Sequence, residues 1–211
     1  MSKLKVAVLA SGRGSNLKAI LDSIKRGELN CEIVLVISNK RDAGAFDIAK
    51  EYDIPRLQIA LEQFESQEEF DIAFLTALKK YNTDFIVLAG YLKKVSSIVI
   101  REYKNKILNI HPALLPAFGG EGMYGLRVHQ AVLDYGCKVS GVTVHLVDEE
   151  YDSGPPILQR CVPVLESDTA QSLAARVLVE EHRIYADALK LFAEGRVRIE
   201  GRKVIFDKII E

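Results

Sequence analysis

Apolar runs of strand length alternate with amphipathic stretches of helical period through the first half of the chain. This alternation is typical of βαβ units, in which a helix connects two parallel strands. We therefore expect an α/β fold: a doubly wound, mostly parallel sheet with helices on both faces, followed by a C-terminal hairpin. Strands are expected at 5–10, 32–38, 85–89, 107–110, 141–146 and 157–164, with a weaker one at 56–59. Helices are expected at 17–25, 44–52, 67–81, 128–135 and 169–193, and the hairpin at 197–205.

The last of these helices carries its own boundary signals. Asp168 or Ser167 offers an N-cap, and Gly195 offers a stop. No linker, repeat or low-complexity tract interrupts the 211 residues. We expect a single domain over 1–211, with an N-terminal half at about 1–105 and a C-terminal half at about 106–211.

Composition excludes several classes of protein. The formal net charge is −1, with both signs interspersed, so there is no basic surface of the kind that binds nucleic acid. The three cysteines have neither CxxC nor metal-ligand spacing, which argues against a disulfide framework and against zinc. No signal peptide or membrane span is recognisable. The expected protein is cytoplasmic, without metal, nucleic-acid or membrane partners.

The segment 106–116 combines an apolar strand with polar residues at its end. Asn109 and His111 are two positions apart and therefore project to the same face of a strand, which Pro112 terminates. An amide that stabilises an oxyanion and an imidazole that exchanges a proton are what attack on a carbonyl requires. Asp152, in a turn, could reach the same pocket. On the residues alone, a strand-capping Asn109 and a structural His111 remain an equal alternative.

A glycine-rich turn follows the first strand. Gly12, Gly14, Ser15 and Asn16 open a helix, and backbone N–H groups at such a terminus can bind an anion. The third glycine of the dinucleotide fingerprint is replaced by Leu17, and no acid for a ribose diol follows the second strand. The turn favours a terminal monophosphate, or else serves only tight packing.

Residues 116–125 contain four glycines directly after the suspected active strand. We expect a mobile loop, which acts either as a lid beside the site or as a tolerated surface insertion.

Taken together, the motifs resemble those of the phosphoribosylglycinamide formyltransferases, folate-dependent enzymes of purine synthesis. The resemblance runs from Val6 to about Ala193. It rests on the strings at 11–16, 87–91, 108–112, 114–116, 141–145, 152–155 and 181–182, which are weak singly and specific in this order and spacing.

The resemblance implies a set of functional residues and ligands. Asn109, His111 and Asp152 would be catalytic, and Gly14, Ser15, Asn16 and Glu181 would bind glycinamide ribonucleotide. The folate would contact Gln67, Leu92, Lys93, Lys94, Val95, Asn109, Asp148, Glu149, Glu150 and Tyr151. The donor would be 10-formyltetrahydrofolate, with no metal, and the protein would be a monomer or homodimer. Gln67 and Leu178 depart from the family, which has Arg and in some members Gln there.

The implied reaction is direct formyl transfer to the glycinamide amine. Asn109 would donate to the oxyanion, and Asp152 would hold His111 as an imidazolium. His145 is expected to be a hydrogen-bonded core residue. Two alternatives remain: a formyltetrahydrofolate hydrolase using the same three residues, and a non-catalytic nucleotide-binding module. The resembled hydrolases carry an additional N-terminal domain, for which 211 residues leave no room.

Overall fold

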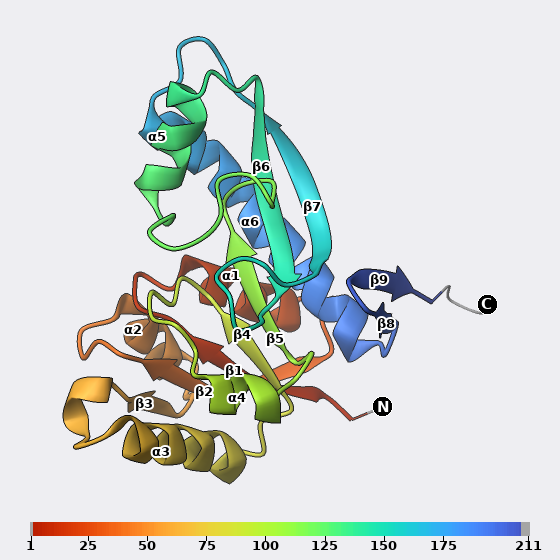
Figure 1. Cartoon of the computed structure of the whole chain (residues 1–211). Helices are drawn as coiled ribbons and strands as arrows, with labels where there is room; N and C mark the ends of the chain where they lie inside the picture. Colours follow the sequence, from red (N-terminus) through yellow and green to blue (C-terminus); the bar gives the residue numbers. More distant parts are fainter. Residues whose placement is uncertain (1, 208–211) are drawn as a thin grey trace. The chain divides into compact units, whose positions relative to one another are not determined.

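The computed structural model describes residues 2–207. The chain forms two compact units, Met1–Leu108 and Asn109–Glu211 (Figure 1). That the two units fold as a single domain remains a prediction. In chain order the elements are β1 Leu4–Leu9, α1 Ser15–Lys25, β2 Cys31–Ser38, α2 Gly44–Glu51, β3 Arg56–Gln58, η1 Leu61–Gln63, α3 Gln67–Lys80, β4 Phe85–Leu88, α4 Ser97–Glu102, β5 Ile107–His111, α5 Leu126–Asp134, β6 Val139–Leu146, β7 Pro156–Pro163, α6 Ala170–Ala193, β8 Val197–Glu200 and β9 Lys203–Phe206.

The strands confirm the predicted α/β class. They form one seven-stranded sheet in the order β3-β2-β1-β4-β5-β6-β7, and β8 pairs with β9 in a separate antiparallel hairpin. β1 is parallel to both β2 and β4, whereas β6 and β7 are antiparallel. Every expected strand and helix is present, with ends within two residues of those predicted. The period of the apolar residues was therefore a sufficient signal for these elements.

The strand order reverses beside β1, within the first unit. β1 has β2 on one side and β4 on the other, and chains leaving the carboxyl ends of β1 and β4 diverge. Ligands of doubly wound sheets bind at such switch points. The glycine-rich turn that follows β1 and the segment Leu92–Val95 that follows β4 both leave the sheet here. Helices α1 and α2 pack together against β2, while α3 packs on α4.

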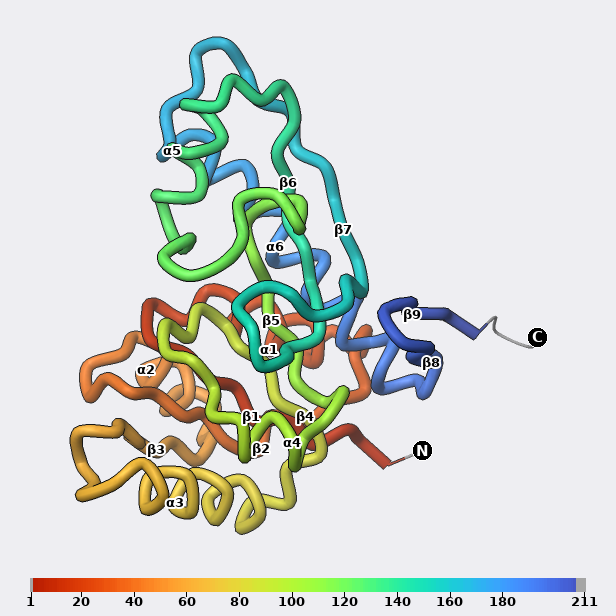
Figure 2. The backbone as a smooth tube through the Cα atoms, viewed as in Figure 1, coloured from red at the N-terminus to blue at the C-terminus, as the bar shows by residue number. Residues whose placement is uncertain are grey.

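In the second unit, α6 lies along β6 and β7 and also packs on α5. Between β5 and α5 the backbone runs as a long loop over residues 112–125 (Figure 2). Thr143 on β6 anchors the start of this loop. Its buried hydroxyl donates to Ala113 O at 2.7 Å and accepts from Leu115 N at 3.0 Å. The chain leaving β5 is thereby fixed to the neighbouring strand.

The predicted N-cap of α6 was wrong. Thr169 caps the helix, accepting a hydrogen bond from Ser172 N at 3.2 Å. Asp168 instead forms a two-bond pair with the Arg176 guanidinium, at 2.7 and 2.8 Å, and also accepts from Leu165 N. Arg176, eight residues along the chain, engages the Asp168 carboxylate, and the adjacent Thr169, which has a similar capping propensity, caps the helix. Gly195, with φ of 65°, follows the helix end as expected.

Two short helical segments were not predicted, the three-residue η1 and α4. α4 spans only the six residues Ser97–Glu102, between β4 and β5. Six residues are fewer than two helical turns, so an apolar period cannot be recognised in them.

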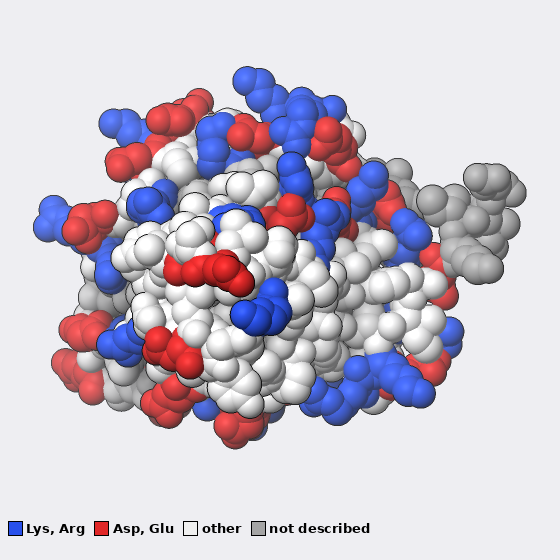
Figure 3. Space-filling model, turned by 90° about the horizontal axis from the view of Figure 1, so that it is seen from above, with Lys and Arg blue, Asp and Glu red and all other residues white. Residues whose placement is uncertain are grey.

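Charges of both signs are interspersed on the face that Figure 3 shows, and neither forms a continuous field there. This agrees with the formal net charge of −1. Among the residues that the structure describes, no helix has the length and apolar character to cross a bilayer.

Gly141 lies inside β6, where a side chain has no space. A Cβ atom there would lie 2.2 Å from the Arg160 carbonyl oxygen and 2.6 Å from Leu114 Cδ2. We expect Gly141→Ala to lower the free energy of unfolding by roughly 1–3 kcal/mol, because β7 must move to admit the methyl group. Urea denaturation measures this. Gly12→Ala is the control, since its Cβ would meet nothing within 4 Å. Equal stability of the two variants would contradict the packing.

Candidate active site

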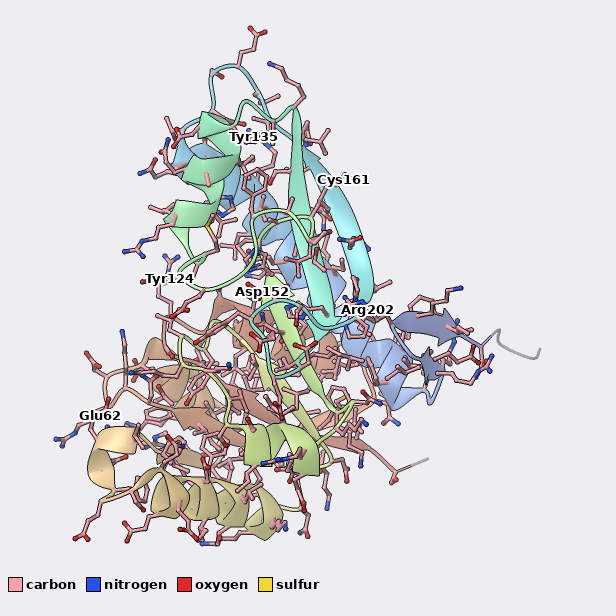
Figure 4. The ribbon with its side chains drawn as sticks, in the orientation of Figure 1. Glu62, Tyr124, Tyr135, Asp152, Cys161 and Arg202 are labelled. Atoms are coloured by element: carbon pink, nitrogen blue, oxygen red, sulfur yellow. The ribbon has the colours of Figure 1, made fainter. Side chains whose placement is uncertain are left out.

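Three polar side chains meet at the carboxyl end of β5, within the second unit. Asn109 and His111 lie on β5 as predicted, and His111 is only 3% exposed. Asp152 comes from the turn between β6 and β7, and its side chain is 10% exposed. Figure 4 shows Asp152 beside the end of β5. The structure thus brings together the three residues that the sequence analysis expected to share a pocket.

The Asp152 carboxylate lies between these two side chains. Its Oδ2 is 3.4 Å from His111 Nδ1, and its Oδ1 accepts from Asn109 Nδ2 at 3.4 Å. The N–H of Gly120 donates to Oδ2 at 2.9 Å. Asp152 has φ of 54°, an uncommon backbone conformation for a residue other than glycine. Such outliers persist where surrounding contacts hold them in place, as the contacts to this carboxylate do.

Two glycines allow the chain to approach Asp152 closely. A Cβ atom at Gly154 would lie 1.8 Å from the Leu146 carbonyl oxygen, so the turn can return beside β6 only with glycine there. At Gly119 it would lie 2.5 Å from Leu115 Cδ2 and 3.1 Å from Asp152 Cβ. The glycine at 154 therefore sets the turn that carries Asp152, and the glycine at 119 brings the loop against its side chain.

His145 is a fourth member of this cluster that the sequence analysis placed only in the core. It is buried, and its Nδ1 lies 2.8 Å from the Leu146 carbonyl oxygen, which can only accept. Nδ1 therefore carries a hydrogen, and Nε2, which lies 3.5 Å from Asp152 Oδ1, can accept from Asn109 Nδ2 at 3.1 Å. This assignment turns the amide nitrogen of Asn109 towards Asp152. His145 thus determines which end of Asn109 donates in the site.

The loop after β5 contacts the same cluster. His111 Nε2 donates to the Phe118 carbonyl oxygen at 2.8 Å. Together with the Gly120 contact to Asp152, this fastens the first half of the predicted glycine-rich loop to two candidate catalytic residues. Phe118 itself has φ of 56°.

Burial and charge act against each other in the cluster. Burial lowers the pKa of His111, opposed by the Asp152 carboxylate and the Phe118 carbonyl, and the net shift is downward. For Asp152, burial raises the pKa, but the combined effect of His145, His111 and Gly120 N–H brings it below its usual value. This direction runs against the expectation that Asp152 holds His111 as an imidazolium, because desolvation outweighs the attraction of the carboxylate. A charged carboxylate beside a neutral imidazole is an arrangement suited to accepting a proton.

His129 lies on α5, the helix that follows the glycine-rich loop. It is 3% exposed, and its Nδ1 has no hydrogen-bond partner among the described residues. Burial, with a smaller contribution from His111, lowers the pKa of His129 to about 4. The ring therefore stays neutral near pH 7 and adds no positive charge beside His111.

The phosphate-binding candidate lies in the first unit. Gly14 is the N-cap of α1 with φ of 81°, and its Cβ would lie only 2.8 Å from Ala45 Cα, so no other residue fits without a shift. Helix α1 is described in full and has no side-chain cap and no acidic residue in its first turn. Ser15 and the buried Asn16 open it. The positive end of α1 is therefore not occupied by an acidic side chain from its own first turn, and phosphate binding there stays a prediction.

The predicted folate residues of the first unit lie in two places. Leu92 N donates to Ser11 Oγ at 3.0 Å, which connects the segment after β4 to the start of the glycine turn. Lys93 pairs with Glu62 at 3.7 Å, Lys94 follows it, and Val95 is buried. Gln67 lies apart in the first turn of α3, where its Nε2 donates to Asp71 at 2.8 Å. Gln67, which stands where related enzymes have Arg, therefore has a hydrogen-bond partner within its own helix.

The remaining predicted residues belong to the second unit. Asp148 accepts from Ser153 Oγ at 2.6 Å and from Glu150 N at 3.1 Å, which shapes the turn 148–153. Glu149, Glu150 and Tyr151 are exposed in that turn. Glu181 is half-buried on α6. Across residues 2–207 no His, Cys, Asp or Glu side chains are grouped so as to hold a metal ion.

Comparison with known proteins gives a consistent result. A family model described as formyl transferase matches residues 4–189. The chain is 42% identical over 193 residues to the chloroplastic phosphoribosylglycinamide formyltransferase of Vigna unguiculata, covering 92% of this chain and 62% of that protein. It is 36% identical to the phosphoribosylglycinamide formyltransferase of Escherichia coli, covering 97% and 94%. The chain thus spans less than two thirds of the plant protein and nearly all of the bacterial one.

A solved structure agrees with these relatives. Glycinamide ribonucleotide transformylase 1 from Symbiobacterium toebii superimposes with a TM-score of 0.91 and 43% identity, covering 97% of this chain and 94% of that one.

The buried neutral histidine should make stability depend on pH. Between pH 6.5 and about 4 the unfolded chain protonates His129 while the folded chain does not, so stability falls as the pH falls. From pH 7 to 4.5 we expect the wild type to lose roughly 2 kcal/mol more than His129→Gln, which has no group titrating at this position. Urea denaturation at each pH measures the two slopes. Parallel slopes would show that His129 is not buried as a neutral ring.

Proposed function

The chain belongs to the formyl transferase family, and from this premise we propose that it transfers a formyl group from 10-formyltetrahydrofolate to the amine of glycinamide ribonucleotide. The products are N-formylglycinamide ribonucleotide and tetrahydrofolate. The observation that carries the proposal is the convergence of Asn109 and His111 on the single carboxylate of Asp152. The names of the relatives support the choice of acceptor.

In the proposed mechanism the free amine attacks the formyl carbon and gives a tetrahedral intermediate. Asn109 Nδ2 carries two hydrogens, of which His145 accepts one. The other makes only a long contact of 3.4 Å with Asp152 and is therefore available to the oxyanion. The collapse of the intermediate breaks the bond between the formyl carbon and N10 of the folate.

The proton balance assigns a role to the imidazole. The attacking amine loses one proton, and N10 of the leaving folate gains one. His111 Nδ1, beside Asp152, receives the first proton and returns it, with a water at the carboxylate as the relay. Once protonated, the ring has an acceptor on each side, Phe118 O and Asp152 Oδ2, and both stabilise the imidazolium. No covalent enzyme intermediate is involved.

The substrate contacts follow the family positions. The phosphate of the ribonucleotide binds Gly14, Ser15 and Asn16, and Glu181 contacts its ribose or glycinamide end. The folate binds the backbone of Leu92–Val95, the turn Asp148–Tyr151, and Gln67. The first turn of α1, which has no acidic residue, and the connection of Leu92 to the glycine turn support this assignment. We place the protein in the cytoplasm, as a monomer or homodimer.

The proposal is tested by following loss of formyl from 10-formyltetrahydrofolate with and without glycinamide ribonucleotide. We expect turnover only when the ribonucleotide is present, and none above background in His111→Asn, because the proton acceptor is removed. Turnover without the ribonucleotide would identify a hydrolase. No turnover in either condition, with binding of the ribonucleotide retained, would leave a binding module.

A second prediction separates Asn109 from the residue that orients it. Asn109→Ala should lower kcat by about 10²–10³, the usual effect of losing an oxyanion donor. His145→Phe keeps a ring but lets the amide turn, so it should lower kcat by about three- to tenfold with KM little changed. In the Asn109→Ala background, His145→Phe should cost nothing further. Additive losses would show that His145 does not act through Asn109.

A further inference from the structure

Phe118 combines a strained backbone with a contact to the candidate catalytic histidine. Its φ of 56° is in the left-handed region, which costs a non-glycine residue free energy unless other contacts hold it. In this conformation its carbonyl oxygen accepts from His111 Nε2 at 2.8 Å. The hydrogen bond therefore depends on whatever keeps Phe118 in place.

The Phe118 ring has one aromatic partner among the described residues, Tyr135. The two ring centroids are 5.9 Å apart and the planes are at 81°, which is an edge-to-face pair. Tyr135 is 81% exposed, and most of its surface contacts no other residue. Figure 4 shows it at the end of α5. Because most of this ring is exposed to water, it contributes little to the packing of the hydrophobic core.

The backbone of Tyr135 is well fixed. Tyr135 is the C-cap of α5, and its N–H donates to Ala131 O at 3.0 Å. Gly136, with φ of 78°, and Cys137, whose N–H donates to Val132 O, then turn the chain away. Because α5 packs on α6, the ring projects from a rigid support next to a loop.

We propose that Tyr135 is a positioning residue for the proposed formyl transfer, whose ring holds Phe118 so that the Phe118 carbonyl keeps a hydrogen on Nε2 of His111. With Nε2 committed to this carbonyl, Nδ1 is the nitrogen that exchanges a proton beside Asp152. Without the ring pair, Phe118 leaves its strained conformation part of the time. The imidazole then divides between two tautomers, and only one of them has a free Nδ1.

The first test is kinetic. An edge-to-face pair accounts for about a two- to tenfold change in a population, so Tyr135→Ala should lower kcat by that factor with KM for both substrates little changed. Tyr135→Phe keeps the ring and should retain wild-type kcat. Phe118→Ala should match Tyr135→Ala, and the double variant should lose no more than either. Tyr81→Ala is the control, since Tyr81 is likewise the C-cap of a helix, α3, and should change nothing.

The second test observes the imidazole directly and does not require turnover. The chain has four histidines, so two-bond proton–nitrogen spectra of histidine-labelled protein can be assigned with His111→Asn. At pH 8 the wild type should show His111 as the Nε2–H tautomer, and Tyr135→Ala should shift both nitrogens towards averaged values. An unchanged His111 spectrum in Tyr135→Ala, or a loss of kcat in Tyr135→Phe equal to that in Tyr135→Ala, would overturn the proposal. If the wild type transfers no formyl group, the proposed function fails while the spectra still decide the role of Tyr135.

Discussion

The buried carboxylate of Asp152 is the constraint on which the site depends. A charged group taken out of water must be compensated by nearby donors, or it becomes neutral. Here Gly120 N–H and Asn109 Nδ2 donate to it, and the rings of His111 and His145 lie within 3.5 Å. These groups come from β5, β6 and the loop after β5, so the charge on one residue ties three segments of the second unit together. Together they bring the pKa of Asp152 below its usual value despite burial.

The backbone around this carboxylate adopts conformations and close approaches that few residues allow. Asp152 and Phe118 both have positive φ, and glycines stand at 119 and 154 where no Cβ has room. Each of these features costs conformational free energy or limits the sequence, and they are grouped around the same side chain. Strain concentrated in this way is found where geometry serves chemistry, since packing alone could be achieved with relaxed conformations.

Three buried histidines of the second unit illustrate how surroundings assign roles to identical side chains. His111 has an acceptor at each nitrogen, which suits a ring that gains and loses a proton. His145 has a carbonyl acceptor at one nitrogen and an amide donor at the other, which suits a ring of fixed orientation. His129 lacks a partner for Nδ1 among the described residues, and burial keeps it uncharged. The chemical differences arise from partners 1 to 41 residues away along the chain.

The sequence by itself determined the strands, the longer helices, the glycine-rich turn before α1 and the shared face of Asn109 and His111, because each is expressed in a local period or motif. The tertiary structure decided the rest. In the sequence, His145 is indistinguishable from the other inward-facing residues of an apolar strand. Only the folded structure brings its Nε2 to Asn109, which is 36 residues away along the chain. Asp168 and Thr169 have similar capping propensity, and Arg176 on the next turns of α6 decided between them. Likewise, desolvation determines that the pKa of His111 shifts downward, and the ring is desolvated only once the chain has folded around it.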